Sequence, residues 1–336
     1  MAPEPAPDDV VRLADARAVA RRARDWAAAD DLLARIAAAG WKVIDVGTLY
    51  DLVRASPPDV EDGGIVRYGA SSSVPLRLEE AATGTASVVL VATDWPEDVE
   101  RTVRALAAAS PLGTQLIVVA NGESGAQAAA LATLEETWAS RGAESLEIVR
   151  TSVRLGFAAA LNAGIRRATA PVVLVMDASV EPLGDLVTPL VVALEDPSVA
   201  VAGPFGIVSE DLRRFAEAPA GAVDVDAIEG YAQAFRRSDF IARGPFDEHF
   251  TFYRHLDIWW SFVLRDQGED DPDDAPPRRA VRVAGIDVRR HPHRGWTSLA
   301  DEERDRVSKK NFYRVLKRFA SRRDLLVGAG TVRSRP

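Results

Sequence analysis

Residues 155–182 read LGFAAALNAGIRRATAPVVLVMDASVEP, and this stretch decides the fold class of the chain. A glycine-bearing loop leads into a helix, and the apolar run Val172–Met176 follows as a buried strand that ends at Asp177. In open α/β sheets, ligands bind just outside the carboxyl ends of the strands. The position of Asp177 therefore predicts a ligand site at this edge of a sheet.

The chain from Ala86 onward repeats this alternation of strand and helix. Short runs of β-branched residues between helical segments indicate an α/β fold, with a mostly parallel sheet covered by helices on both faces. The expected strands are 87–92, 116–120, 145–150, 172–176 and 199–203, and the expected helices are 97–109, 126–141, 158–168 and 186–194. Residues 204–230 read as irregular, 281–288 as a strand and 299–322 as a long basic helix.

The first 85 residues lack this alternation of strands and helices. Apolar residues at helical spacing predict helices over 10–26 and 30–39, followed by a short strand at 41–46. Prolines, glycines and serines mark 56–85 as a linker with one or two short strands. We therefore expect a disordered tail (1–9), a small helical hairpin module (10–55), a linker (56–85), an α/β domain (86–323) and a C-terminal tail (324–336).

Composition excludes several classes of protein. The chain has 336 residues, 47% of them hydrophobic, which suffices for a large core. Its net charge of −9 argues against bulk nucleic-acid binding, and the absence of cysteine excludes disulfides and thiolate chemistry. The start of the chain lacks a signal-peptide pattern, and no apolar run is long enough to span a bilayer, so a cytoplasmic location is expected.

Several motifs, in order along the chain, resemble inverting family 2 glycosyltransferases of the GT-A fold. RLGFAAALNAGIRRA (154–168) is similar to the family's Asn-x-Gly-Phe…Asn-x-Gly-Ile, and DASVEP (177–182) to its metal motif. The other matching stretches are SVVLVATDWPEDVERTVRAL (87–106), VVANGES (118–124), GPFDEHFTFYRHLDIWWSFVLRDQG (244–268), RRHPHRGWTSL (289–299) and SKKNFYRVLKRF (308–319). The resemblance covers more than two thirds of the chain and implies a Rossmann-like GT-A domain that binds a nucleotide-sugar donor.

The resemblance also implies which residues meet the donor. Ala120 stands where the family carries the acid that recognises a pyrimidine, so the base of the donor stays open. Glu123 either takes over contacts to the ribose hydroxyls or is an exposed turn residue, and Asn162 either contacts the donor or packs its helix on the sheet. The implied donor-binding residues are Thr93, Asp94, Asn121, Gly122, Glu123, Gly156, Phe157, Asn162, Asp177 and Ser179.

A divalent metal, Mn or Mg, is the cofactor that the resemblance implies. Both ions prefer oxygen ligands, and Asp177 is the leading candidate. Ser179 replaces the family's second acid, so either His291 or His293 completes the site or the diphosphate is held without a tightly bound ion. The simpler alternatives are that Asp177 only caps its loop and that the two histidines pack on Trp296.

The residue that activates the acceptor is the least certain part of the pattern. Arg254 and His255 stand where the family usually has a Glu-Asp pair, and Asp257 follows two residues after His255. Imidazole and carboxylate groups both serve as general bases. The catalytic candidates are therefore His255 and Asp257, and the third alternative is that neither acts.

Two functions from different classes fit this sequence. The first is an inverting glycosyltransferase acting on a glycan, lipid or small-molecule acceptor. The second is a catalytically degenerate GT-A protein that binds nucleotides or serves as a scaffold. Residues 20–48 also resemble the small C-terminal helical module of cysteinyl-tRNA synthetases, which leaves an RNA-associated role as a weaker third alternative. The basic helix over 299–322 allows peripheral membrane association, and the oligomeric state stays open.

Overall fold

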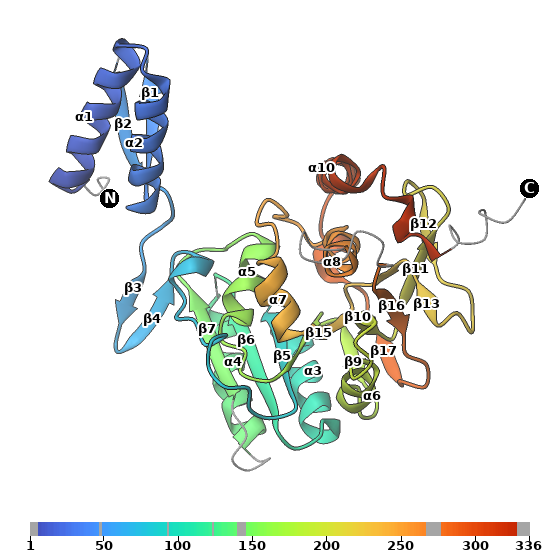
Figure 1. The fold of residues 1–336 in the computed structure, drawn as a ribbon. Helices are drawn as coiled ribbons and strands as arrows, with labels where there is room; N and C mark the ends of the chain where they lie inside the picture. The colour runs from blue at the N-terminus through green and yellow to red at the C-terminus, as the bar shows by residue number, and fades with distance from the viewer. Residues whose placement is uncertain are drawn as a thin grey trace, which may run out of the picture. The chain divides into compact units, whose positions relative to one another are not determined.

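The structure is a computed structural model of the chain, and it describes residues 6–46, 49–92, 94–122, 124–139, 146–266 and 277–327. Two compact units divide at Ala70 and Ser71, and each is described by itself. Figure 1 shows the course of the chain through both units. Among the described helices, none combines the length and apolar composition needed to cross a bilayer.

The first unit contains two helices followed by a β-hairpin. Helix α1 (Asp8–Arg22) packs on α2 (Trp26–Ala38), and strands β1 (Trp41–Val46) and β2 (Leu49–Arg54) pair antiparallel. Its core is a small cluster of Val10, Ala14, Ile36 and Trp41. A second hairpin, β3 (Val60–Asp62) with β4 (Ile65–Tyr68), lies in the segment that was expected to be a linker.

A single large sheet organises the second unit. Its strands are β5 (Ala86–Ala92), β6 (Thr114–Ala120), β7 (Leu146–Thr151), β8 (Val172–Met176), β10 (Val199–Gly203), β13 (Asp224–Val225), β15 (Ala232–Arg236) and β16 (Arg279–Arg282). Within this unit their order is β13-β16-β10-β15-β8-β5-β6-β7. The β8-β5-β6-β7 part is parallel, while β15 runs antiparallel to both β8 and β10. The α/β prediction is confirmed.

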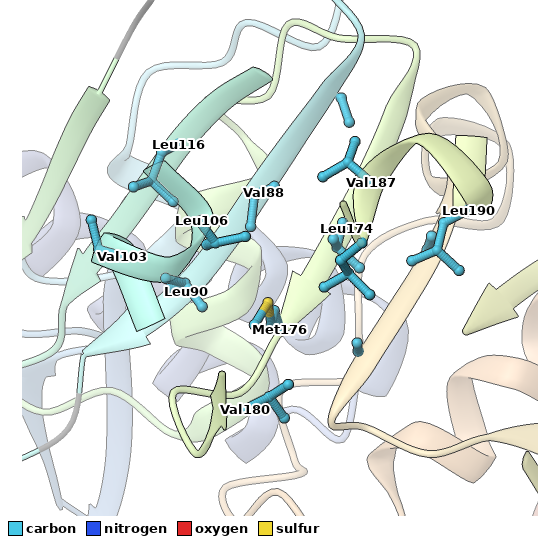
Figure 2. Packing of buried hydrophobic residues seen from close by; sticks show 14 of the residues in the cluster. Val88, Leu90, Val103, Leu106, Leu116, Leu174, Met176, Val180, Val187 and Leu190 are labelled. Atoms are coloured by element: carbon cyan, nitrogen blue, oxygen red, sulfur yellow. The ribbon is translucent and has the colours of Figure 1, made fainter. Parts of the chain in front are cut away.

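Alternate residues of the central strands meet helices on opposite faces of the sheet. On one face, Val88 and Leu90 of β5 join a cluster with Val103 and Leu106 of α3 (Pro96–Ala109), as Figure 2 shows. On the other face, Val89 contacts the backbone position of Gly164 in α5 (Phe157–Ile165), where a Cβ would approach Val89 Cγ1 to 2.6 Å. Each fully buried aliphatic side chain of this kind contributes about 1.5–3 kcal/mol. The two-residue period of the strands thus fixes both helix layers.

The remaining helices and short strands surround this sheet. They are η1 (Ser71–Ser73), α4 (Gly125–Ala139), β9 (Val180–Pro182), α6 (Val187–Ala193), β11 (Gly206–Ser209), β12 (Phe215–Glu217), β14 (Ala227–Ile228), α7 (Arg237–Arg243), α8 (Leu256–Arg265), β17 (Val288–Arg290), α9 (Arg294–Thr297), α10 (Asp301–Phe319) and η2 (Arg323–Leu325). Strand β11 pairs with β12 and β14 to form a small second sheet, and β17 pairs with β9.

Three expectations about local structure were wrong. The strand expected over 281–288 is two strands, β16 and β17, which pair with β10 and β9 across a turn at Gly285, where φ is +79°. The segment 204–230, expected to be irregular, contains the small sheet. The helix expected from residue 10 to 26 ends at Arg22, because Asp25 caps a new helix by accepting a hydrogen bond from the Ala28 N–H at 3.1 Å.

Candidate functional site

The strand order reverses between β5 and β8. From β5 the chain moves outward through β6 and β7 and then returns to β8 on the other side of β5. Ligands of open α/β sheets bind at such a reversal, outside the carboxyl ends of the strands. Asp94 follows β5 and Asp177 follows β8, so both predicted acids lie at this edge of the sheet.

Asp177 is hydrogen-bonded to the distant His293. The Asp177 Oδ2 atom lies 3.0 Å from His293 Nε2, and Asp177 Oδ1 accepts a hydrogen bond from the Ser179 N–H at 2.7 Å. Burial favours a higher pKa for Asp177, but the hydrogen bond and charge of His293 outweigh it and hold this pKa below its usual value. The same pair raises the pKa of His293 despite the opposing effect of burial. The two groups therefore stabilise each other's charged forms.

Contacts on both sides hold the His293 ring in place. Its Nδ1 atom accepts a hydrogen bond from the Trp296 N–H at 3.2 Å, and the Tyr253 ring stacks on it with centroids 4.1 Å apart. The pairing of β17 with β9 brings residues 291–293 next to the end of β8. The His291 N–H extends this pairing by donating to the Ser179 carbonyl at 2.8 Å. The imidazole of His293 is thus fixed beside the carboxylate of Asp177.

His291, the other predicted ligand, pairs with a different acid. Its Nε2 atom lies 2.8 Å from Glu181 Oε2, and His291 is not among the residues that line the cavity beside Asp177. The two histidines thus form two separate imidazole–carboxylate pairs. The structure brings His293 to Asp177 and directs His291 elsewhere.

The donor set at Asp177 fits a divalent metal that a substrate completes. The described residues contain no group of three or more His, Cys, Asp or Glu side chains that could hold an ion by themselves. The Ser179 hydroxyl is buried close to Asp177 and forms no hydrogen bond of normal geometry with any described group. A carboxylate oxygen and this hydroxyl are therefore available, and His293 Nε2 would become a ligand on losing the proton that it shares with Asp177. Mn or Mg sites commonly leave further positions to phosphate and water.

Asp177 and His293 open into a cavity of about 820 Å³. Residues from β8, the small second sheet, α8, the α9 region and α10 line it. Asp257 and His255, the two candidate bases, also line this cavity, as does Phe157. One cavity therefore holds the predicted metal end and the predicted acceptor end of the site.

The turn after β6 is tied to the loop before α5. Asn121 Oδ1 accepts from the Leu155 N–H at 2.7 Å, and Asn121 Nδ2 donates to the Leu155 carbonyl at 3.0 Å. Gly122 has a φ of +66°, and a Cβ there would approach Arg154 N to 2.8 Å, so a side chain is excluded. The Asn121 side chain and the Gly122 conformation thus hold the turn after β6 against the loop between β7 and α5.

Asp94 forms an ion pair with Arg154, and both side chains are largely exposed. This pair bridges the end of β5 and the loop after β7, beside the predicted donor turn. Thr93 and Glu123, which were also expected to contact the donor, lie outside the described residues.

Gly156 and Phe157 begin α5 against the acceptor-side segment. The Phe157 N–H donates to the Thr251 carbonyl at 3.0 Å, and a Cβ at Gly156 would approach Thr251 Cα to 3.0 Å. The Phe157 ring meets Tyr253 edge-on at a centroid distance of 6.0 Å. This packing couples the start of α5 to the wall of the cavity.

Asn162 is buried and joined to the acceptor-side motif. Its Nδ2 donates to the Phe246 carbonyl at 2.9 Å and to Glu248 Oε1 at 3.0 Å, and its Oδ1 accepts from the Phe246 N–H at 3.0 Å. Asn162 is not among the residues lining the cavity. Its described contacts are those of a residue that fastens α5 to 246–248.

The two candidate bases have opposite electrostatic settings. Burial, assisted by the charge of Arg254, lowers the pKa of His255 from 6.5 to about 4. Burial raises the pKa of Asp257, although its two oxygens accept hydrogen bonds from the Gly230 and Ile258 N–H groups, each at 2.9 Å. A carboxylate whose pKa is raised is a better proton acceptor near neutral pH than an imidazole whose pKa is lowered. The electrostatic settings thus favour Asp257 over His255.

Several cavity residues were not anticipated, and three of them are Glu229, Tyr231 and Tyr253. Glu229 and Tyr231 flank the end of the segment read as irregular, and Tyr253 stacks on His293. Burial raises the pKa of each of the three groups. Only Tyr253 had a signal in the sequence, because it lies inside the acceptor-side motif.

Comparisons with known proteins agree with this fold. A family model described as Glycosyl transferase family 2 matches residues 87–255, which is half of the chain. The crystal structure of GalNAc-T7 with UDP, GalNAc and Mn2+ is similar, with a TM-score of 0.54 at 16% identity, over 70% of this chain and 48% of that one.

The mannosyltransferase PcManGT from Pyrobaculum calidifontis, in complex with GDP-Man and Mn2+, gives a TM-score of 0.47 at 19% identity, over 67% of this chain and 62% of that one. This chain thus spans less than two thirds of either of these proteins. No curated protein sequence matches it.

The α/β fold, the acid at the carboxyl end of β8 and the match over residues 87–255 converge on one assignment. This chain belongs to glycosyl transferase family 2.

Proposed function

We propose that this protein transfers a sugar from a nucleotide-sugar donor to an acceptor hydroxyl, with inversion at the anomeric carbon. The observation that carries the proposal is the shared cavity of about 820 Å³, which Asp177, His293 and Asp257 all line. Transfer requires charge stabilisation at the departing diphosphate and a base at the attacking hydroxyl, and the same cavity offers groups suited to both needs.

The donor end of the cavity centres on Asp177. We infer that Asp177 and His293, with the Ser179 hydroxyl, would hold a Mn or Mg ion at the donor end of the cavity. Such an ion, when bound, neutralises the negative charge that develops on the leaving group. The family resemblance extends the donor site to Asp94, Asn121, Gly122, Gly156 and Phe157, and to Thr93 and Glu123, while the contacts of Asn162 assign it to the packing of α5. The similar structure of GalNAc-T7 with UDP, GalNAc and Mn2+ supports a nucleotide ligand of this type.

The acceptor end centres on Asp257. We infer that its carboxylate accepts the proton of the acceptor hydroxyl as that oxygen attacks the anomeric carbon. The backbone N–H groups of Gly230 and Ile258 orient the carboxylate and leave further lone pairs for the substrate. A single displacement of this kind inverts the configuration and needs one base on the side away from the leaving group. His255 is the weaker candidate because its pKa is about 4.

Calorimetry with a panel of nucleotides and nucleotide sugars, with and without Mn2+, tests the donor assignment. We expect one nucleotide class to bind, more tightly with Mn2+, and the Asp177→Asn variant to lose the gain from Mn2+. The Asp287→Asn variant is the control, because Asp287 is exposed and does not line this cavity. If no nucleotide or nucleotide sugar binds the full chain, the proposal fails.

A binding protein without turnover is the second candidate. Ala120, Ser179 and His255 each replace an acid that the resembling family usually carries. Product analysis separates the two functions: release of nucleoside diphosphate from the bound donor supports the transferase, while donor binding with no release under any acceptor supports the binding protein.

A further inference from the structure

Four basic side chains line the same cavity as Asp177 and Asp257. Arg213 and Arg214 lie between β11 and β12, Arg254 precedes α8, and Lys309 belongs to α10. All four are exposed, and none forms an ion pair within the described part of the chain. Three separate segments, far apart in sequence, therefore contribute positive charge to one cavity.

The two neighbouring arginines stand on an anchored turn. Asp211 Oδ1 accepts from the Arg213 N–H at 2.8 Å and from the Arg214 N–H at 2.9 Å. The preceding Leu212 is only 1% exposed and has a φ of +61°. A leucine rarely adopts this left-handed conformation, so the buried side chain and the Asp211 contacts hold the turn against a local cost.

Arg254 is held in a similar way. Its guanidinium lies 4.9 Å from the centroid of the Trp296 ring, and the next residue, His255, has a φ of +66°. Arg24, Leu212 and His255 are the non-glycine residues with positive φ in the described ranges, and two of the three adjoin these cavity arginines. In the resembling family an acid usually occupies the position of Arg254, so this chain reverses the charge there.

The carboxylates of the cavity form no ion pair with the four cations, although the charge of Arg254 acts on Asp257 and Glu229 from a longer distance. Asp177 is paired with His293, and Glu229 lies 3.7 Å from Arg290. Asp257 accepts backbone hydrogen bonds and is the proposed base. Glu217 is the remaining acid of the lining, and it is exposed. The unpaired charge is therefore mainly positive and accessible to a ligand.

We propose that the acceptor carries an oxyanion, a phosphate or a carboxylate, which Arg254 and Lys309 bind with help from Arg213 and Arg214. Guanidinium and ammonium groups form charge-assisted hydrogen bonds to both kinds of oxyanion. This inference rests on the proposed transferase function, because it names the acceptor class of the same cavity. Under this proposal Arg254 selects the acceptor by binding its charged group, at a position where the resembling family usually carries an acid.

Titration of matched sugars tests the proposal. The full chain is first saturated with Mn2+ and with whichever of UDP or GDP binds, so that the donor site is filled. Glucose, glucuronate and glucose 6-phosphate are then titrated calorimetrically. We expect at least one charged sugar to bind about tenfold or more tightly than glucose, because one charge-assisted contact supplies that factor. The two charged probes distinguish phosphate from carboxylate recognition.

Variants distinguish the effect of positive charge inside the cavity from the effect of positive charge elsewhere on the surface. Arg254→Gln and Lys309→Ala each should remove most of the preference for the charged sugar, while Lys310→Ala should leave it unchanged, because Lys310 does not line the cavity. Arg254→Lys, which keeps the charge, should retain part of the preference and guards against a folding defect.

Two results would overturn the proposal. One is equal affinity for glucose and both charged sugars, including no measurable binding of any of them. The other is that Arg254→Gln weakens UDP or GDP binding and leaves the charged sugars unaffected, since the cations would then serve the donor diphosphate. Absence of nucleotide binding before any sugar is added would contradict the proposed transferase function, and it is therefore distinguishable from failure of the acceptor proposal.

Discussion

His293 Nε2 lies 3.0 Å from Asp177 Oδ2, across 116 residues of sequence. A second imidazole–carboxylate pair, His291 with Glu181 at 2.8 Å, lies two residues earlier on the same segment. The first pair lines the cavity and the second does not. The chain thus contains its own control for the role of a histidine at the candidate metal site.

The His293→Ala substitution should weaken Mn-dependent donor binding. Loss of a residue that merely orients a ligand typically costs 10–100-fold in metal affinity, so loss of a direct ligand should cost at least about tenfold. The measurement is donor affinity by calorimetry as a function of Mn2+ concentration. His291→Ala also breaks an imidazole–carboxylate pair but should leave the Mn2+ dependence unchanged. Equal losses in both variants would show that His293 acts only through stability.

The Asp257→Asn substitution should abolish most turnover and spare donor affinity. Loss of a general base lowers kcat by about 10²–10⁴. Because burial raises the pKa of Asp257, the acid limb of the kcat/KM profile in the native protein should lie above the usual carboxyl value of 3.8. The rate should fall as the pH drops through this limb, since only the ionised carboxylate accepts a proton.

Asp185→Asn provides a matched control for Asp257. Asp185 also accepts two backbone hydrogen bonds, from Val187 at 2.9 Å and Thr188 at 3.0 Å, but it does not line the cavity. This variant should keep its turnover. Full activity of Asp257→Asn, with the donor consumed at the native rate, would eliminate Asp257 as the base.

His255 should make the folded state sensitive to acid. Its pKa is lowered to about 4 from 6.5, so between these values the unfolded chain binds a proton that the folded chain does not. The free energy of unfolding therefore falls as the pH falls from about 6.5 to about 4, by about 3 kcal/mol for the full shift at 1.36 kcal/mol per pKa unit.

Urea unfolding of the native protein and of His255→Asn at pH 7.5, 6, 5 and 4.5 measures this contribution. Asparagine tolerates the left-handed backbone and does not titrate. The difference in unfolding free energy between the two proteins should shift in favour of the variant as the pH falls. A difference that is independent of pH would contradict the lowered pKa.

The Asn162→Ala substitution should destabilise the protein and leave donor affinity intact. It removes three hydrogen bonds and leaves the buried N–H of Phe246 unsatisfied, which costs about 1–3 kcal/mol. Thermal unfolding measures the loss, and calorimetry with the donor provides the second readout. A large loss of donor affinity with unchanged stability would instead assign Asn162 to the donor site.

Much of the fold was predictable because strands and helices leave a local pattern. The apolar runs that became β5, β6 and β8 were identified correctly because each is a continuous β-branched segment next to an amphipathic helix. The strands of 204–230 were missed because they are two to four residues long, which is too short to show a period. The break at Gly285 was missed because a single turn divides one apolar run.

The amino-acid sequence alone places Asp177 at the end of a buried strand, because the apolar run before it is a local feature. It also supplied every side chain now found in the cavity. The long-range packing brings His293 rather than His291 to Asp177, and it places Asp257 and Arg254 in one cavity with them. These choices depend on the pairing of β17 with β9 and on the packing of α8 and α10, which join segments far apart in sequence and leave no periodic signal in it.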